Sequence, residues 1–310
     1  MSGRARALRV ARRPLRLSAK QGANAVRAFD PRVTPARADL AAKELAGKLV
    51  AARYVEGRVC EVIAPQAPLR REPRPDAALD SEALKGERVM IYDTNAQGWA
   101  WGQLAADGYV GWLPAAALAP EGAAPTHKVT ALRTLAFAGP SIKLPPLEAL
   151  PFGARLAIAR SEHPMAVTQS GAYVPAVHLQ PIDDNETDFV AVAERFLGVP
   201  YLWGGKTSLG LDCSGLVQIA LAACGISCPR DSDMQEAALG TAVAGAADLY
   251  DLRRGDLVFW KGHVAIVRDR LSLVHANAFH MAVAIEPLAD AIVRIRGAGS
   301  EVTSVRRIGR

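Results

Sequence analysis

One cysteine and two histidines in the C-terminal third of the chain have a spacing that suits nucleophilic catalysis. Cys213 lies in the string DCSGLVQ, His263 opens HVAIV fifty residues later, and His275 lies twelve residues further on in LSLVHAN. A thiol, a base and a group that orients the base are the parts of an activated nucleophile. The sequence therefore predicts that Cys213 attacks an electrophilic carbon with the help of the histidines.

The two histidines are expected on neighbouring strands. The strings DLVFW and HVAIV flank the dipeptide Lys261-Gly262, which is typical of a two-residue hairpin turn. A second turn centred on Asp269 would place His263 directly opposite His275. Cβ atoms of directly opposed residues lie roughly 4.5–5.5 Å apart, so the two imidazoles would lie side by side on one face of the sheet.

The residues after Cys213 are expected to form a helix that begins at the cysteine. LVQIALAAC is helical in composition and spacing, and Gly225 is placed to end this helix. Unpaired N–H groups and the helix dipole would favour a thiolate at the N-terminus, and the same groups would stabilise an oxyanion. Most free cysteines are simply small buried residues, but here a base and an orienting group complete a workable layout.

These segments resemble the NlpC-type, papain-like cysteine peptidases of bacterial cell walls. The matching strings are YLWGG, DCSGLVQ, RRGDLVFW, GHVAIV and VHA, which occur in order between about Phe189 and Arg296. The resemblance implies that Cys213 is the nucleophile, His263 the general base and acid, and His275 the third, orienting member. It also implies hydrolysis of a peptide bond through the cysteine.

Other kinds of site fit the sequence less well. The string GKT at 205–207 is similar to the end of a P-loop, but that pattern needs a glycine where Pro200 stands. Cys224 and Cys228 lack the second Cys/His pair of a zinc finger. Zinc held by the nucleophile and the two histidines would be a catalytic site without its usual signature. We expect no metal and no cofactor.

Length and composition indicate a soluble, globular, multidomain protein. The chain has 310 residues, of which 50% are hydrophobic and 22% charged, and this length is enough for roughly two domains. It contains no run of about 18 apolar residues that would cross a membrane. The four cysteines, at 60, 213, 224 and 228, are too unevenly spread for a disulfide framework. A reducing compartment is expected.

The positive charge of the chain is concentrated at its N-terminus. Residues 1–29 carry eight of the 37 Lys and Arg residues and no Asp or Glu, so the remaining 29 basic and 31 acidic residues give a net charge of −2. This basic leader lacks the apolar segment of a secretory signal. We expect a disordered leader rather than a nucleic-acid or lipid-binding arm. The protein is expected to be a cytoplasmic monomer without nucleic-acid or membrane partners.

A weak internal repeat lies between the leader and the catalytic part. The strings GERVMIYDTNAQGWAWGQLAADGYVGWLP and GARLAIARSEHPMAVTQSGAYVPAVHL both read as short strands separated by turns, with Tyr109 and Tyr173 at comparable places. Such a pattern predicts two small β-barrels. The first resembles bacterial SH3-like domains, with GYVGW as its best marker, and the second resembles them more loosely.

The predicted fold class is multidomain, with two small SH3-like β-barrels followed by an α+β papain-like cysteine peptidase domain. In the last part, a helix in DFVAVAERFLG ended by Gly198 and the Cys213 helix precede an antiparallel sheet. A short helix is expected in ARADLAAKEL. The expected boundaries are 1–48 for the leader and short helix, 49–121 for barrel 1, 126–183 for barrel 2 and 184–310 for the catalytic domain.

Two SH3-like barrels before such a peptidase resemble the γ-D-glutamyl-L-diamino-acid endopeptidases of cell-wall peptide recycling. The resemblance implies that barrel 1 closes the cleft and that acidic and aromatic groups bind the free amine of an N-terminal L-Ala. The substrate would be L-Ala-γ-D-Glu-diamino acid. The residues expected to line its binding site are Tyr201, Trp203, Asp212, Ser214, Asp231, Ser232, Glu72 and Tyr109.

These substrate-binding residues have simpler alternatives. The alternatives are a solvated loop charge for Glu72, core packing for Trp203 and a helix cap for Asp212. A buried ammonium nevertheless needs a carboxylate, and Asp231 lies shortly after the nucleophile helix. Two other functions remain open: a peptidoglycan-binding general wall hydrolase, and an amidase or acyltransferase. The carboxylates argue against the latter, because a lipid or ester substrate brings no ammonium.

Overall fold

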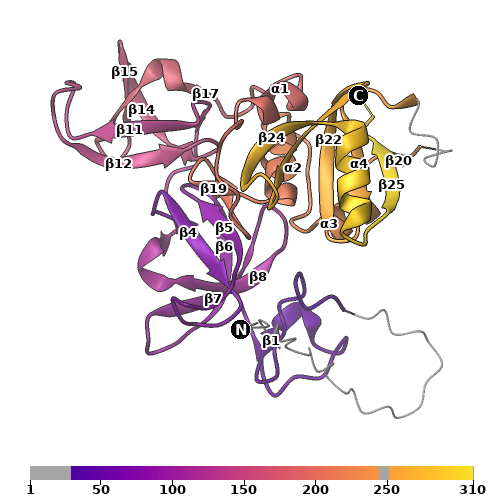
Figure 1. Ribbon diagram of the computed structural model, residues 1–310. Coiled ribbons are helices and arrows are strands. Elements are labelled where there is room, and N and C mark those ends of the chain that lie inside the picture. Colours follow the sequence, from indigo (N-terminus) through magenta and orange to yellow (C-terminus); the bar gives the residue numbers. More distant parts are fainter. Residues whose placement is uncertain (1–28, 244–250, 310) are drawn as a thin grey trace, which may run out of the picture.

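The computed structural model describes residues 29–243 and 251–309, so almost all of the expected basic leader lies outside the described residues. The described chain forms three regions that follow one another in sequence. Figure 1 shows the first region below the other two, the second region at the upper left and the third, with most of the helices, at the upper right.

The first region is built around a seven-stranded antiparallel sheet in the order β5-β4-β8-β7-β6-β3-β9. Buried and partly exposed residues alternate along β4 and β8, as expected when one face of a sheet covers a core. Leu69, Leu104 and Leu113 are almost completely buried there. The elements are β1 (Ala41–Ala42), η1 (Lys43–Leu45), β2 (Tyr54–Val55), β3 (Arg58–Val62), β4 (Gln66–Arg70), β5 (Leu79–Leu84), β6 (Arg88–Thr94), β7 (Trp99–Leu104), β8 (Val110–Pro114), η2 (Ala115–Ala117) and β9 (Leu118–Pro120).

The segment 30–49, here called the N-terminal strap, corrects one expectation. The short helix expected in ARADLAAKEL is absent; instead β1 pairs in parallel with β2, and the single 3-10 turn η1 follows. Leu40, Ala41 and Ala42 are all fully buried, against aromatic side chains of β6 and β7. A surface helix exposes one face, so three consecutive buried residues favour an extended chain at this point.

The second region contains a three-stranded sheet, β13-β10-β17, and a five-stranded sheet, β12-β11-β16-β15-β14. Its elements are β10 (His127–Val129), β11 (Arg133–Phe137), β12 (Pro146–Pro151), β13 (Arg155–Leu156), β14 (Ile158–Glu162), β15 (Met165–Thr168), β16 (Tyr173–Pro175), η3 (Ala176–His178) and β17 (Leu179–Pro181). The internal repeat is visible in the backbone: β8-η2-β9 and β16-η3-β17 follow the same order. Pro114 (φ −58°, ψ 123°) and Pro175 (φ −55°, ψ 119°) precede the two 3-10 turns in almost the same conformation.

The third region places helices beside a six-stranded antiparallel sheet in the order β20-β25-β21-β22-β23-β24 (Figure 1). Ten of the eleven residues of α2 are buried, between α1 and the sheet. No helix within 29–243 or 251–309 is long and apolar enough to cross a membrane. The elements are α1 (Phe189–Glu194), β18 (Lys206–Thr207), β19 (Gly210–Leu211), α2 (Cys213–Ala223), α3 (Ser232–Ala238), β20 (Thr241–Ala242), β21 (Asp256–Trp260), β22 (His263–Asp269), β23 (Ser272–Asn277), β24 (Ala282–Pro287), α4 (Leu288–Gly297) and β25 (Val302–Arg307).

The ends of the two helices before the sheet follow from local sequence. Asp212 caps α2 by accepting a backbone N–H from its first turn at 2.7 Å, and Gly225 follows the helix with φ +73°. Asp188 caps α1 in the same way. The α-helix ends at Glu194, earlier than the expected end at Gly198, which has φ +80°.

The first region packs directly against the segment that leads to α2. Gly204 has φ +79°, and a Cβ at this position would lie 2.5 Å from the carbonyl oxygen of Leu79 in β5, so only glycine allows this close approach. The backbone N–H of Lys206 donates to Glu82 Oε2 at 2.9 Å, and its ammonium pairs with Glu87 at 3.4 Å. These contacts fix β5 beside the start of the nucleophile helix.

Candidate active site

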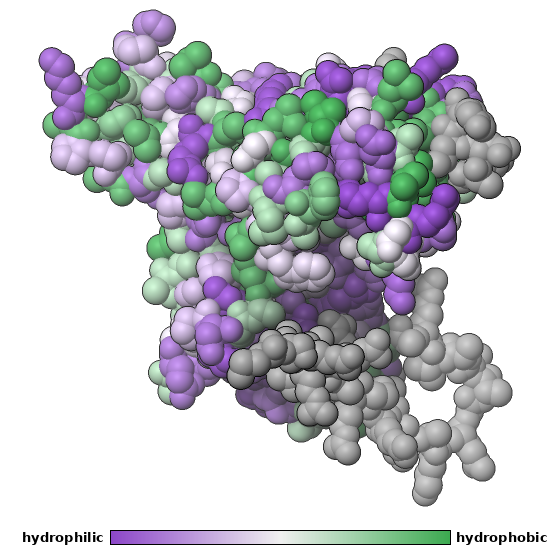
Figure 2. Space-filling model, viewed as in Figure 1, coloured by the Kyte–Doolittle hydropathy of each residue, from purple (hydrophilic) through white to green (hydrophobic). Residues whose placement is uncertain are grey.

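A pocket of about 240 Å³ lies between the first region and the third, with Cys213 in its wall. Seen from the same direction as Figure 1, Figure 2 shows a recess with a hydrophilic surface between these two parts of the molecule. Four further lining residues, Arg32, Arg71, Asp80 and Asp233, are charged and were not predicted. The predicted site residues that line the pocket are Tyr109, Tyr201, Trp203, Asp212, Cys213, Ser214, Asp231 and Ser232.

The first hairpin turn, at Lys261-Gly262, is confirmed by the pairing of β21 with β22. The register across the second turn is two residues away from the expected one. Val267 pairs with Leu273 rather than Leu271, because the strands turn later and the ladder is irregular just before Asp269. The Asp269 carboxylate accepts the N–H of Leu271 and the hydroxyl of Ser272 and stabilises this later turn.

The two histidines nevertheless meet, because a shift of two residues leaves side chains on the same face of a sheet. His263 Nε2 lies 3.0 Å from His275 Nδ1, and the ring centroids are 5.2 Å apart. The expected direct pairing of the two residues is therefore wrong, while the expected contact between their imidazoles is confirmed. The Trp260 ring lies 5.6 Å from the His263 ring on its other side.

A buried carboxylate continues this chain of contacts. His275 is almost completely buried, and its Nε2 lies 2.9 Å from Glu286 Oε2. Arg294 donates to both oxygens of Glu286, at 2.8 and 2.6 Å. Glu286 was not predicted, although a lone carboxylate in the otherwise apolar strand AVAIEP is an unusual feature that points to a buried partner.

These partners define the tautomers of both imidazoles. A carboxylate accepts hydrogen bonds, so His275 carries its proton on Nε2, facing Glu286, and presents a lone pair at Nδ1. His263 must then donate its Nε2–H to His275 Nδ1. The Nδ1 atom of His263 is left as the acceptor that a general base requires.

The same neighbourhood contains a group of possible metal ligands. One ligand atom each from His275, His280 and Glu286 lies within 4.8 Å of the others. Hydrogen bonds account for this grouping: Glu286 contacts His275, and Asn277 Oδ1 lies 3.0 Å from His280 Nδ1. The arrangement orients the imidazole next to His263.

Burial controls the proton affinities of the candidate nucleophile and base. It raises the pKa of Cys213 to about 12, with a further rise from the Asp212 carboxylate, although backbone N–H groups and Arg230 act in the opposite direction. The backbone N–H groups act in the expected direction, but burial has the larger effect. Burial, with the neighbouring His275, lowers the pKa of His263 to about 3. Burial thus favours the neutral form of both groups.

A buried arginine braces the start of α2. Arg230 donates to both oxygens of Asp212, at 2.9 and 2.7 Å, to Ser214 Oγ at 2.9 Å, and across to Ser81 of β5 at 3.1 Å. Asp212 also accepts the N–H of Gly204 at 2.8 Å. Its carboxylate is thus a helix cap and the partner of Arg230, and Asp212 and Ser214 hold the cysteine in position.

Two aromatic side chains lie close to the nucleophile. Burial raises the pKa of the Tyr201 hydroxyl, and the neighbouring Cys213 adds to this rise. Trp203 lines the pocket and is 67% exposed, so it does not pack in the core. Both side chains come from the YLWGG segment and can contact a substrate at the mouth of the pocket.

A carboxylate of the third region and a tyrosine of the first region also meet in the wall of this pocket; they form what is here called its amine-binding end. The Tyr109 hydroxyl donates to Asp231 Oδ2 at 3.0 Å. The predicted partner Glu72 does not line the pocket; it pairs with Arg74 at 3.0 Å and is exposed. The carboxylate that the first region supplies to the lining is instead Asp80.

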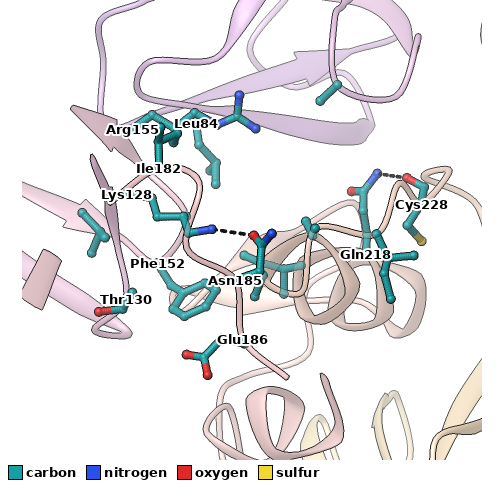
Figure 3. Close-up of a pocket in the computed structure, with 18 of the residues that line it drawn as sticks. Leu84, Lys128, Thr130, Phe152, Arg155, Ile182, Asn185, Glu186, Gln218 and Cys228 are labelled. Carbon is teal, nitrogen blue, oxygen red and sulfur yellow. Dashed lines mark hydrogen bonds between the residues drawn. The ribbon is translucent and has the colours of Figure 1, made fainter. Parts of the chain in front are cut away.

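A larger cavity of about 350 Å³ lies where all three regions meet (Figure 3). Lys128 donates to Asn185 at 3.0 Å on one side, and Gln218 donates to the carbonyl of Cys228 at 3.1 Å on the other. None of its lining residues is the candidate nucleophile or one of the two histidines next to it. The chemistry therefore belongs to the smaller pocket.

The Cys213 thiol lies at a helix N-terminus and meets the backbone N–H of Val264, the residue after His263. A thiol combined with a histidine pair is the arrangement expected of a cysteine peptidase. Residues 198–297 match the NlpC/P60 family, and residues 69–118 match the bacterial dipeptidyl-peptidase SH3 domain. The chain therefore carries a cysteine-peptidase domain of the NlpC/P60 family at residues 198–297, preceded by an SH3 domain at residues 69–118. This identification agrees with the resemblance expected from the motifs.

The chain is similar to several bacterial peptidases. It is 28% identical over 250 residues to a gamma-D-glutamyl-L-lysine dipeptidyl-peptidase of Bacillus cereus, covering 68% of this chain and 71% of that protein. It is 33% identical over 129 residues to a Bacillus subtilis protein of the same name, covering 39% and 40%. The crystal structure of an NlpC/P60 family protein from Bacillus cereus superposes with a TM-score of 0.67 at 23% identity, over 80% of this chain and 99% of that one.

Proposed function

We propose that the protein hydrolyses the bond between γ-D-glutamate and a diamino acid, diaminopimelate or lysine, in short cell-wall peptides with a free N-terminal L-Ala. The observation that carries this proposal is a single pocket lined both by Cys213 and by the hydrogen-bonded pair of Asp231 and Tyr109. A thiol can cleave an amide, and a carboxylate can bind an ammonium. The names of the two Bacillus relatives support the same specificity.

The proposal includes the finer fold assignment. We take the second region to be a divergent SH3-like barrel, since it repeats the strand, 3-10 turn and strand of the first. We take the third region to be a papain-like core, since its nucleophile helix packs beside an antiparallel sheet that carries the histidines.

In the first half of the reaction, His263 Nδ1 removes the proton from the Cys213 thiol while the sulfur attacks the γ-carbonyl carbon of D-Glu. Burial favours the protonated thiol, so proton transfer accompanies attack. Backbone N–H groups at the start of α2 stabilise the oxyanion, and Tyr201 lies beside them. His263 then donates the proton to the departing amine of the diamino acid, and a thioester remains on Cys213.

In the second half, water attacks the thioester. His263 accepts a proton from this water and returns it to the sulfur, which releases L-Ala-γ-D-Glu and restores the thiol. His275 and Glu286 keep His263 in the tautomer that both halves require. The relay changes no oxidation state and needs no further reactant.

Recognition depends on the charge of the substrate amine. Asp231 binds the ammonium of L-Ala, and Tyr109 holds the carboxylate from the first region. An uncompensated buried carboxylate is costly, so substrates without the ammonium bind poorly. In intact peptidoglycan this amine is linked to muramic acid. We therefore propose that the enzyme acts as a monomer, inside the cell, on peptides already released from the sugar chains.

Incubation with L-Ala-γ-D-Glu-diaminopimelate and its L-lysine counterpart, followed by mass spectrometry, tests the proposal. We expect L-Ala-γ-D-Glu and the free diamino acid from at least one of the two. Cys213→Ala should yield neither, whereas Cys60→Ala, which changes a cysteine in the core of the first region, should keep activity. Comparable release of peptides from intact peptidoglycan would instead support a general wall hydrolase.

A further inference from the structure

Arg32 of the N-terminal strap reaches into the amine-binding end of the pocket from a part of the chain that is distant in sequence. Its carbonyl accepts the N–H of Val110, next to Tyr109, at 2.8 Å. The carbonyl of Val33 accepts a hydrogen bond from Gln103 Nε2 at 2.9 Å. The backbone around Arg32 is thus attached to the first region, and its side chain points toward the third.

The guanidinium of Arg32 connects the strap to the start of α3. Nη1 lies 2.7 Å from Asp231 Oδ2, and the two terminal nitrogens lie 2.8 Å from the two oxygens of Asp233. Asp30 accepts from Nε and from Nη2, at 3.1 and 2.7 Å. This planar fork satisfies several carboxylates at once, which a lysine ammonium cannot match.

Asp231 is oriented by these contacts rather than by the helix it precedes. It stands at the N-cap of α3, yet its side chain makes no capping hydrogen bond. Both hydrogen bonds to its carboxylate, from Arg32 and Tyr109, reach Oδ2. Among the described residues none donates to Oδ1, so this oxygen is available to an ammonium in the pocket.

We propose that Arg32 is a positioning residue of the amine-binding pocket: it fixes Asp231 through Oδ2, leaves Oδ1 for the substrate ammonium, and closes the pocket against peptides that extend beyond L-Ala. This inference rests on the proposed function and adds the N-terminal strap to the substrate-binding site. The specificity for a free amine then depends on three segments, the strap, β8 with its preceding tyrosine, and the start of α3.

Competition between Arg32 and the substrate amine is the main alternative. A guanidinium on Asp231 would then occupy the place of the ammonium and would have to leave before peptide binds. Two observations argue against this. The Arg32 carbonyl is bound by Val110, and its guanidinium is also held by Asp233 and Asp30. Its single positive charge is shared among several carboxylates, so Asp231 keeps negative charge for a ligand.

Three strap variants test the proposal: Arg32→Ala, Arg32→Lys and the control Lys43→Gln. Lys43 lies on the same strap, and its exposed ion pair with Glu56 is away from the pocket. For each variant, kcat and KM are measured on L-Ala-γ-D-Glu-diamino acid and on the same peptide acetylated at its amine. Kd for the free-amine peptide is measured by calorimetry in a Cys213→Ala background, where no turnover occurs.

We expect Arg32→Ala to raise KM and Kd for the free-amine peptide about 10-fold, which corresponds to roughly 1.4 kcal/mol, with kcat nearly unchanged. The preference for the free over the acetylated peptide should fall by a similar factor, because the pocket is no longer closed. Arg32→Lys should recover part of the loss, and Lys43→Gln should match the parent protein. A change in KM without one in kcat identifies lost binding rather than lost chemistry.

Two results would overturn the inference while leaving the proposed function intact. A lower Kd in Arg32→Ala would show that the guanidinium competes with the substrate, and unchanged constants would show that it only joins two regions. If Arg32→Ala fails to fold, Asp233→Asn, which loosens the same guanidinium, must raise Kd to sustain the inference. A parent protein that cleaves neither peptide would instead refute the proposed function, and the inference with it.

Discussion

The two ends of the active-site pocket are constructed differently. The catalytic end, from Cys213 through the histidine pair to Arg294, lies within one region and on neighbouring elements. The amine-binding end joins Arg32, Tyr109 and Asp231, which come from three segments; the contacts of Arg32 bridge up to 201 positions in the sequence. The first end is a property of one fold, and the second exists only where separate regions pack together.

This difference indicates how the chemistry and the specificity depend on different parts of the chain. The residues of the proposed catalytic relay all belong to the third region, whereas the proposed selection of a free amine also involves the first region and the strap. The second region supplies no such residue to the pocket lining. Tyr173 was expected at a place comparable to Tyr109, but when Pro114 and Pro175 are matched it takes the place of Trp112 instead. It contacts Arg160 and does not line the pocket. Only one of the two repeats has acquired a role in the site.

The largest effect is expected at the catalytic end. His263→Ala removes the base from both halves of the reaction and should lower kcat by about 10⁴-fold, as loss of comparable groups does. His275→Asn keeps a polar group beside His263 and should cost less. Purified variants with matched melting temperatures are compared by kcat on the proposed tripeptide. A greater loss in His275→Asn would contradict the assignment of His263 as the base.

Glu286 provides a sharper test of the catalytic end, because it touches no substrate. Glu286→Gln replaces an acceptor by a group that can also donate, so the His275 tautomer is no longer fixed. We expect kcat to fall about 10- to 100-fold, similar to losses at supporting ligands of metal-bound histidines, with little change in KM. The control is Glu301→Gln, which breaks the exposed pair with Arg296.

Nitrogen NMR shifts of His275 separate this role from simple loss of packing. The parent protein should show Nε2–H, and Glu286→Gln should show a mixture of tautomers. If the tautomer is unchanged while kcat falls, Glu286 does not act by orienting His275. If KM rises as much as kcat falls, Glu286 affects substrate binding as well as chemistry, and the catalytic and amine-binding ends are not independent.

The catalytic end was largely predictable from sequence because its residues lie on neighbouring elements of one region. The helix that begins at Cys213 follows from a cap, a run of helix-forming residues and Gly225, and the histidine contact follows from strand periodicity. The differences from the predictions also have physical causes. The turn register shifted because Asp269 stabilises a later turn, and burial outweighed the helix dipole in setting the pKa of Cys213.

The amine-binding end was predictable only in part. Asp231 and Tyr109 were identified through motifs near the nucleophile and in GYVGW, and the structure brings them together. Glu72 was placed in the pocket wrongly, and Arg32 was missed. The sequence pattern around Glu72 and Arg32 does not indicate which loop of the first region packs against the third region. That contact depends on how two folded surfaces fit together.

A smaller effect is expected at Tyr109, with Tyr173 of the second region as the control. Tyr109→Phe removes one hydrogen bond to a charged carboxylate and should lower kcat/KM for the free-amine peptide about 10-fold, mainly through KM. Tyr173→Phe should leave both constants unchanged. Equal effects from the two substitutions would show that the repeats contribute alike. Loss of kcat alone in Tyr109→Phe would place the tyrosine in the chemistry rather than in recognition.

The smallest effect concerns acid stability, in which the two ends should respond over different ranges of pH. Burial lowers the pKa of His263 to about 3 and that of His275 to about 4, below the value of about 6.5 expected in the unfolded chain. Between about pH 6.5 and 4 the unfolded chain therefore binds protons that the folded chain does not. The free energy of unfolding therefore decreases as the pH is lowered across this range.

At the amine-binding end stability should change only at lower pH, because Arg32 lowers the pKa of Asp233 from its ordinary 3.8. The stabilisation from that pair persists above pH 3.8 and disappears only below it. Between pH 7 and 4.5, His275→Asn should therefore lose less in melting temperature than the parent protein, by roughly 2–4 °C if about 1 kcal/mol is involved. Asp233→Asn should parallel the parent over the same range. If the melting temperatures of all three proteins change in parallel with pH, His275 does not lower stability in acid. The burial of its neutral ring would then need another explanation.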